Sequence, residues 1–159
     1  MEYIKFGEDG FWDRWPEQLD HFHAQQGAAN TGTKIGYFLM GDASENPPTV
    51  LALEMKPGEI QARHSHPCHR FEIVAKGTLT TESGRVLEPG DVMISEPHQP
   101  YGPSQAGPDG CVTFEIFSFF SGSYRGSLVF DDGDEVGFDA NVPGRTPADI
   151  ARERRAAGK

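Results

Sequence analysis

The sequence contains no apolar run that approaches the roughly 20 residues a membrane-spanning helix requires. Its first five residues, 1–5, contain no apolar core of the kind found in signal peptides. We therefore expect no membrane partner and a cytoplasmic location.

Cysteine and basic residues are also scarce. The two cysteines, Cys68 and Cys111, are too few for a disulfide scaffold, and we expect free thiols. Lysine and arginine together number 14 against 24 acidic residues, which gives a net charge of −10. An acidic chain repels phosphate backbones, so we expect no nucleic-acid partner.

Turn-forming residues, by contrast, are abundant. The 159 residues include 19 glycines and 12 prolines, a density that favours short strands over a helical bundle. Apolar or alternating segments separated by turn signals predict strands at 34–40, 49–55, 60–66, 71–75, 78–81, 85–87, 91–95, 111–120 and 124–130. Their spacing is typical of an all-β sandwich or barrel.

The pattern divides the chain into three parts. Residues 1–33 predict an irregular N-terminal arm, anchored by Trp12 and Trp15, with a short helix over 17–26. Residues 34–130 predict the barrel, and residues 131–159 an acidic loop followed by a short C-terminal helix. Thr146, Pro147 and Asp149 suit the cap, first position and first turn of that helix.

Four of the six histidines fall within 35 residues: His64, His66, His69 and His98. At the end of an expected strand, the two-residue period places the side chains of His64 and His66 on one face. Two neutral imidazoles on one face form half of a site for iron, zinc, nickel, copper or manganese. A third ligand must come from elsewhere in the chain.

The residues from Gly58 to His66 resemble the opening of the first cupin motif, a glycine followed after five residues by His-x-His. Gly77 stands where the closing glycine of that motif is expected, and residues 89–92 are similar to the start of the second motif. The resemblance covers about residues 49–120. It implies a cupin double-stranded β-helix (jelly-roll) barrel that holds a metal at its mouth.

The sequence departs from the cupin pattern at two places. Arg70 occupies the usual position of a metal-binding glutamate, and Glu72 is expected to face the same way. Counting from Gly90 places the second-motif histidine at Tyr101, whereas a turn three residues shorter places it at His98. The residues around His98 resemble cupins of the anti-sigma-factor ChrR type, and this favours His98 as the third ligand.

A three-histidine site without the glutamate resembles the cysteine and diketone dioxygenases among cupins. The resemblance implies one divalent transition metal at His64, His66 and His98, with Fe(II) favoured and Zn, Ni or Mn as alternatives. We therefore predict a metal-dependent cupin that acts on a small, anionic substrate, an Fe(II) dioxygenase. The alternative is a non-catalytic, small-ligand-binding or structural cupin.

Arg70 could hold a substrate carboxylate through a bidentate contact. Arg70 and Tyr101 are then the catalytic candidates, and Arg70, Glu72 and Tyr101 the substrate-binding ones. In the other possible arrangement Arg70 pairs with Glu72, which leaves a structural site. Because an exposed strand edge is a liability that pairing removes, we also predict a homodimer.

Overall fold

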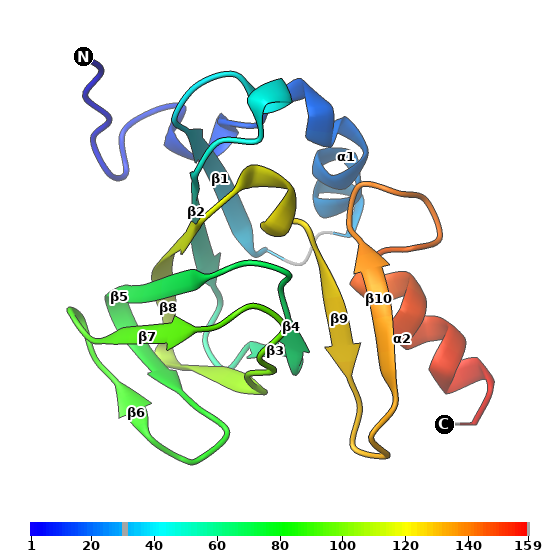
Figure 1. The fold of residues 1–159 in the computed structure, drawn as a ribbon. Helices are drawn as coiled ribbons and strands as arrows, with labels where there is room; N and C mark the ends of the chain where they lie inside the picture. Colours follow the sequence, from blue (N-terminus) through cyan, green and yellow to red (C-terminus); the bar gives the residue numbers. More distant parts are fainter. Residues whose placement is uncertain (30–31, 159) are drawn as a thin grey trace.

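The computed structural model describes residues 1–29 and 32–158, most of which belong to or connect two antiparallel sheets (Figure 1). The larger sheet has seven strands in the path β1-β2-β8-β5-β6, with β3 paired to β8 and β7 paired to β5. These strands are β1 (Lys34–Leu39), β2 (Thr49–Met55), β3 (Ile60–Gln61), β5 (Arg70–Thr80), β6 (Val86–Leu87), β7 (Val92–Ser95) and β8 (Ser104–Phe117). The smaller sheet, in the order β10-β9-β4, contains β4 (His64–Ser65), β9 (Arg125–Val129) and β10 (Glu135–Asp139). The predicted all-β fold class is confirmed.

The central strands β5 and β8 carry alternating residues to the interior of the molecule. Arg70, Glu72 and Val74 of β5 are buried, whereas Phe71 between them is exposed. The register pairs Glu72 with Glu115 of β8, so both carboxyl groups lie on the inward face of neighbouring strands. A hydrophobic core surrounds this polar cluster, built from side chains such as Leu51, Leu53, Val74, Leu79 and Phe117.

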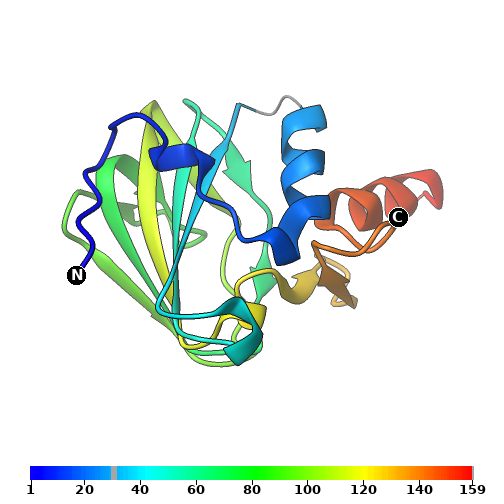
Figure 2. The same cartoon turned by 90° about the horizontal axis from the view of Figure 1, so that it is seen from above.

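The N-terminal arm contains three short helices, η1 (Phe11–Asp13), η2 (Glu17–Leu19) and α1 (Asp20–Ala29). Figure 2 shows the arm running along the larger sheet before it reaches α1. Phe11 packs on Phe38 of β1 with ring centroids 5.1 Å apart, and Trp15 packs on Tyr37 at 5.1 Å. The predicted short helix is present, but it begins at Glu17 as a 3-10 turn and continues as α1 to Ala29.

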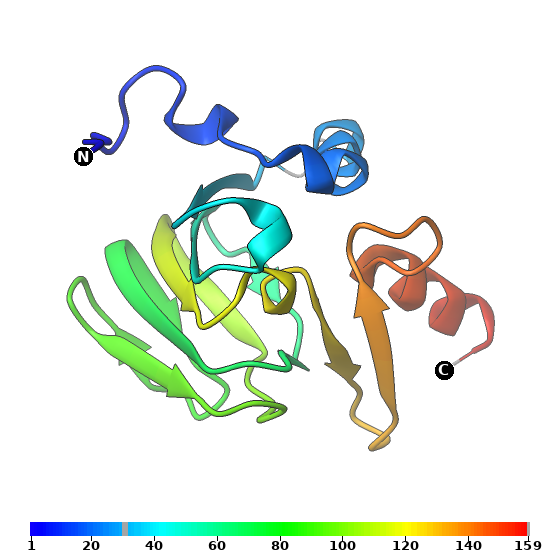
Figure 3. The same ribbon diagram turned by 45° about the horizontal axis from the view of Figure 1, so that its top comes forward.

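At the other end of the chain, α2 (Pro147–Ala156) begins with a complete capping box. The Thr146 hydroxyl accepts from the backbone N–H of Asp149, and the Asp149 carboxylate accepts from the backbone N–H of Thr146. Figure 3 shows the loop before α2 facing α1, where the backbone N–H of Phe22 donates to Asn141 Oδ1 at 3.3 Å. The two terminal helices therefore flank one side of the barrel.

The structure differs from the sequence prediction at four elements. The single extended segment expected at 60–66 is two short strands, β3 in the larger sheet and β4 in the smaller one. The expected acidic loop ends early, because β10 starts at Glu135, and Asp132 and Asp134 accept from Arg154 of α2. The two strands expected at 71–75 and 78–81 are one strand, β5, with register shifts at its bulges. Strand β8 begins at Ser104, seven residues before the expected position. No helix of the described residues is long and apolar enough to cross a membrane.

Candidate functional site

The two predicted site histidines lie together inside the barrel. His64 is in β4, which pairs with β9, and His66 follows it by two residues. Their side chains are buried, with 8% and 7% of each residue exposed, and their ring centroids are 5.1 Å apart. The two imidazole rings therefore lie next to each other, as their two-residue spacing predicts.

Backbone carbonyl groups fix the protonation of both rings. Nδ1 of His64 lies 2.7 Å from the carbonyl oxygen of Ala62. Nδ1 of His66 lies 2.6 Å from the carbonyl oxygen of Gly122 and 2.9 Å from that of Arg125. Because a carbonyl oxygen only accepts hydrogen bonds, Nδ1 carries the proton in each ring. Each Nε2 consequently presents a lone pair.

The surroundings also keep both rings neutral. Burial lowers the pKa of His64 to about 4, with Arg70 adding to the effect, and only the Ala62 carbonyl opposes it. Burial lowers the pKa of His66 to about 3, with His64 and Arg70 acting in the same direction. Neutral imidazoles with a free lone pair can bind a metal ion or accept a hydrogen bond.

Tyr101, and not His98, is the second-motif residue whose side chain contacts the histidine pair. Tyr101 and His64 form an isolated antiparallel bridge, and the Tyr101 hydroxyl donates to Nε2 of His64 at 2.8 Å. The Tyr101 ring centroid is 4.4 Å from that of His64, and burial raises the pKa of Tyr101 well above its usual value. The counting from Gly90 thus identifies the residue beside the pair.

His98 reaches the site only through its backbone. Its N–H donates to the carbonyl oxygen of His66 at 2.7 Å, and its φ of 61° places it in the left-handed region at a tight turn. The His98 side chain is exposed. The three-histidine set predicted from the sequence is therefore not assembled in this structure. His69 is exposed as well and pairs with Glu96.

Arg70 lies in a fully buried ion-pair cluster next to Tyr101. Its Nη1 and Nη2 both donate to Oε2 of Glu72 at 2.9 Å, and Nη1 lies 3.3 Å from Oε2 of Glu115. Its guanidinium carbon sits 3.9 Å from the centroid of the Tyr101 ring, a cation–π contact. Although burial alone would lower it, the pKa of Arg70 is raised by Glu115, Tyr101 and Glu72. This is the pairing arrangement that the sequence left open, and here it includes a second carboxylate.

Glu115 is a site residue that the sequence reasoning missed. Burial raises its pKa to about 7 against the influence of Arg70, and Glu72 adds to the rise. The alternation of Thr113, Glu115 and Phe117 along an expected strand was the available signal, because all three are buried on one face. Because an acidic residue is almost never fully buried unless it is paired, Glu115 at an inward position of a strand predicts a buried partner.

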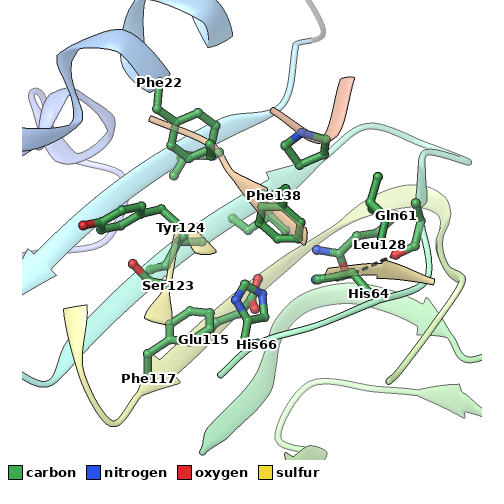
Figure 4. A pocket seen from close by; sticks show the side chains of 16 residues that line it. Phe22, Gln61, His64, His66, Glu115, Phe117, Ser123, Tyr124, Leu128 and Phe138 are labelled. Atoms are coloured by element: carbon green, nitrogen blue, oxygen red, sulfur yellow. Dashed lines mark hydrogen bonds between the residues drawn. The ribbon is translucent and has the colours of Figure 1, made fainter. Parts of the chain in front are cut away.

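A cavity of about 190 Å³ opens between the two sheets beside the histidine pair. Its walls are mostly apolar and come from distant parts of the chain, including Phe22 of α1, Leu51 and Leu53 of β2, Leu128 of β9 and Phe138 of β10 (Figure 4). The His66 ring lies at the wall, 4.9 Å from the Phe117 ring and 6.0 Å from the Phe138 ring. The polar side chains of the lining are Gln61, His64, His66, Glu115, Ser123 and Tyr124.

The donor groups present do not fit the metal centre that the cupin resemblance implies. Arg70 stands at the usual glutamate position, and its guanidinium group has no lone pair that could replace the carboxylate as a metal ligand. Tyr101 stands where an imidazole is expected, and its hydroxyl already occupies Nε2 of His64. Within residues 1–29 and 32–158, no three His, Cys, Asp or Glu side chains are grouped so that they could hold a metal ion.

Comparison with known proteins identifies the fold. No family model matches the chain, and no curated protein matches it. Among solved structures, an acetylacetone dioxygenase from Acinetobacter johnsonii is 16% identical over 100% of this chain and 93% of that chain, with a TM-score of 0.54. An RmlC-like cupin protein from Ralstonia eutropha is 15% identical over 80% and 76%, with a TM-score of 0.52.

A third structure, the complex of Rhodobacter sphaeroides SigE with the anti-sigma ChrR, is 16% identical over 54% of this chain and 45% of the matched chain. Its TM-score is 0.46, and no conclusion about this chain is drawn from it. At these identities the likeness concerns the fold alone, and it agrees with the motifs read from the sequence.

Proposed function

Because the chain has the cupin fold, we propose that it binds a small, largely apolar organic molecule in the cavity between its two sheets, against His66. The cavity itself is the observation that carries the proposal: its apolar walls surround a small number of buried polar groups, as in small-molecule sites generally. This proposal follows the ligand-binding alternative that the sequence left open.

The size of the cavity limits the ligand. Its volume of about 190 Å³ is close to the ~150 Å³ of an engineered apolar cavity that holds benzene, and well below the ~300–1,000 Å³ of sites for drug-sized ligands. A molecule of about one ring therefore fills it. Arg70 does not belong to the lining, so a carboxylate in the cavity would not reach the cation that the sequence prediction assigned to it.

A cavity-filling variant tests this function. Ala140 lines the cavity and is 2% exposed, so Ala140→Leu places three further carbons in the space that the ligand would occupy. Ala75, on the exposed side of β5, is the matched control. We expect one-ring compounds such as benzene and phenol to bind wild type and Ala75→Leu in calorimetric titrations, and not to bind Ala140→Leu. Equal binding to all three proteins would show that the cavity is not the site.

The dioxygenase activity predicted from the sequence stays a prediction, and the acetylacetone dioxygenase neighbour alone does not support it, since that likeness concerns the fold. Metal analysis of protein purified without chelator tests it. From the donor groups present, we expect far less than one equivalent of Fe, Zn, Ni or Mn per chain. One equivalent of bound metal in the wild-type protein, lost in both His64→Ala and His66→Ala, would support the hypothesis of a metal-dependent enzyme.

A further inference from the structure

We propose that the ligand of this cavity is a neutral hydroxyl compound, a phenol or a cyclic alcohol of about one ring, whose O–H donates a hydrogen bond to Nε2 of His66. This inference rests on the proposed function and names the chemical class of its ligand. It follows from the hydrogen-bonding capacity that the cavity wall still has available.

His66 offers an acceptor and no donor. Its Nδ1–H is shared between the carbonyl oxygens of Gly122 and Arg125, at 2.6 Å and 2.9 Å. The ring therefore cannot present a second N–H while it is neutral. No described residue donates a hydrogen bond to its Nε2, and the ring lines the cavity (Figure 4). A ligand that carries a donor satisfies this lone pair, whereas an ether or a hydrocarbon leaves it unsatisfied.

The neighbouring histidine is already satisfied on both nitrogens. Nδ1 of His64 donates to the carbonyl oxygen of Ala62, and Nε2 accepts the Tyr101 hydroxyl at 2.8 Å. The Tyr101 ring is in turn held against Arg70, with the guanidinium carbon 3.9 Å from the ring centroid. These contacts leave His66 as the histidine of the pair that a ligand can reach without displacing an internal hydrogen bond.

The remaining polar groups of the wall favour a neutral donor over an anion or a carbonyl compound. Glu115 brings a carboxyl group to the lining, and in its ionised form this group repels a carboxylate ligand. The Ser123 hydroxyl is already donated to the carbonyl oxygen of Phe120 at 2.7 Å. The Tyr124 hydroxyl points away from the middle of the cavity, as Figure 4 shows. The donors left for a ligand carbonyl are the Gln61 amide and the neutral form of the Glu115 carboxyl group, whereas a ligand O–H finds Nε2 of His66, to which no described residue donates.

Four one-ring probes separate these possibilities: phenol, anisole, benzene and benzoate, titrated into protein dialysed against a chelator. We expect phenol to bind about 3- to 10-fold more tightly than anisole or benzene, the difference that one net hydrogen bond supplies. We expect benzoate to bind more weakly than any neutral probe. In His66→Leu the advantage of phenol should disappear while benzene still binds, and the matched variant of exposed His69, His69→Leu, should retain the advantage.

Nitrogen-15 NMR of the imidazole groups in the wild-type protein provides a readout that does not depend on the folding of a variant. Phenol should shift the Nε2 resonance of His66, and anisole should not. Equal affinity for phenol, anisole and benzene would overturn the hydroxyl inference while leaving the cavity function intact. Benzoate as the tightest probe would also overturn it, in favour of an anionic ligand. If no probe binds, the proposed function itself fails.

Discussion

At the scale of single residues, Arg70 explains most of the departure from the expected site. Its guanidinium group is buried, and Glu72, Glu115 and the Tyr101 ring surround it. Burying a lone cation would cost a large desolvation free energy. The two carboxylates offset this cost and allow Arg70 to lie in the core. The sequence identified Arg70 and Glu72 as a possible pair, but Glu115 comes from a strand more than 40 residues away, and its register could not be known.

Breaking this cluster should strongly destabilise the protein. Arg70→Met leaves two buried carboxylates unpaired, and we expect a loss of about 3–5 kcal/mol in the free energy of unfolding, measured with urea. The matched control is Arg125→Met. Arg125 pairs with Asp139, but its side chain is 53% exposed, so its loss should cost less than about 1 kcal/mol. Similar losses in the two variants would contradict the assigned role of Arg70.

The two buried histidines make a further prediction, on the dependence of stability on pH. Their folded-state pKa values, about 4 and about 3, lie below the unfolded value of 6.5, so the stability they contribute is complete above pH 6.5 and is lost as the pH falls. Each contributes a loss of up to about 1.4 kcal/mol per pH unit. Glu115 affects the stability in the opposite direction, because folding raises its pKa from 4.5 to about 7. The stability that it contributes is complete below pH 4.5 and is lost as the pH rises towards 7.

The free energy of unfolding should therefore fall by about 1.4 kcal/mol as the pH is lowered from 6 to 5. Two histidines each lower it over this range, and Glu115 offsets one of these two contributions. Urea unfolding at several pH values in this range measures it. In His66→Gln the decline should nearly vanish, and in His69→Gln, a variant at an exposed position, it should persist. A wild-type stability that does not change over this range would show that the histidines are not buried in neutral form.

At the scale of elements, local sequence patterns predicted strands well where polar turns bound them. Strands β1, β2 and β7 and the start of α2 lie within a residue or two of their expected positions. The first part of β8 was missed because Gly107, Pro108 and Gly110 give it the composition of a loop. Strand β10 was missed because it follows an acidic run, and pairing with β9 overrides that local signal.

Gly77 shows how one residue supports the sheet, and its surroundings lead to a prediction on thermal stability. Its φ is +71°, and a Cβ added there would lie 2.1 Å from the carbonyl oxygen of Gly110 in the neighbouring strand. Gly84 also has a positive φ, +79°, but open space surrounds it. We expect Gly77→Ala to lower the melting temperature clearly more than Gly84→Ala, because both variants carry the backbone cost and only the first forces β5 away from β8. Equal shifts would mean that this close approach is unimportant.

At the scale of the whole molecule, the histidine pair was predictable from the sequence, but the cavity was not. His64 and His66 share a face because they are two residues apart, a local property. The cavity wall, in contrast, combines α1, β2, β9 and β10, and only the folded chain brings these elements together. The choice between His98 and Tyr101 depended on the length of one turn, in which His98 adopts a left-handed conformation that no spacing rule predicts.

The predicted homodimer also belongs to this scale. Phe71, Val92 and Ile94 are 44%, 49% and 65% exposed, and the register of β5 with β7 places them on one outward face. An exposed apolar face of this kind typically marks an interface. We expect light scattering to give twice the 17.5 kDa of one chain, and Ile94→Lys to give the monomer mass. Val142→Lys, at an apolar residue that is 42% exposed elsewhere, is the control. A wild-type mass of one chain would contradict the dimer.

The proposed ligand site depends on the protonation state of the histidine pair, which nitrogen-15 NMR of the imidazole groups measures. We expect both His64 and His66 to be neutral from about pH 8 to about pH 5.5, with the proton on Nδ1 and the lone pair on Nε2. Exposed His69 serves as the internal reference. A proton on Nε2 of His66, or a charged His66 ring within this range, would contradict the proposed site, because the cavity would then present a donor instead of an acceptor.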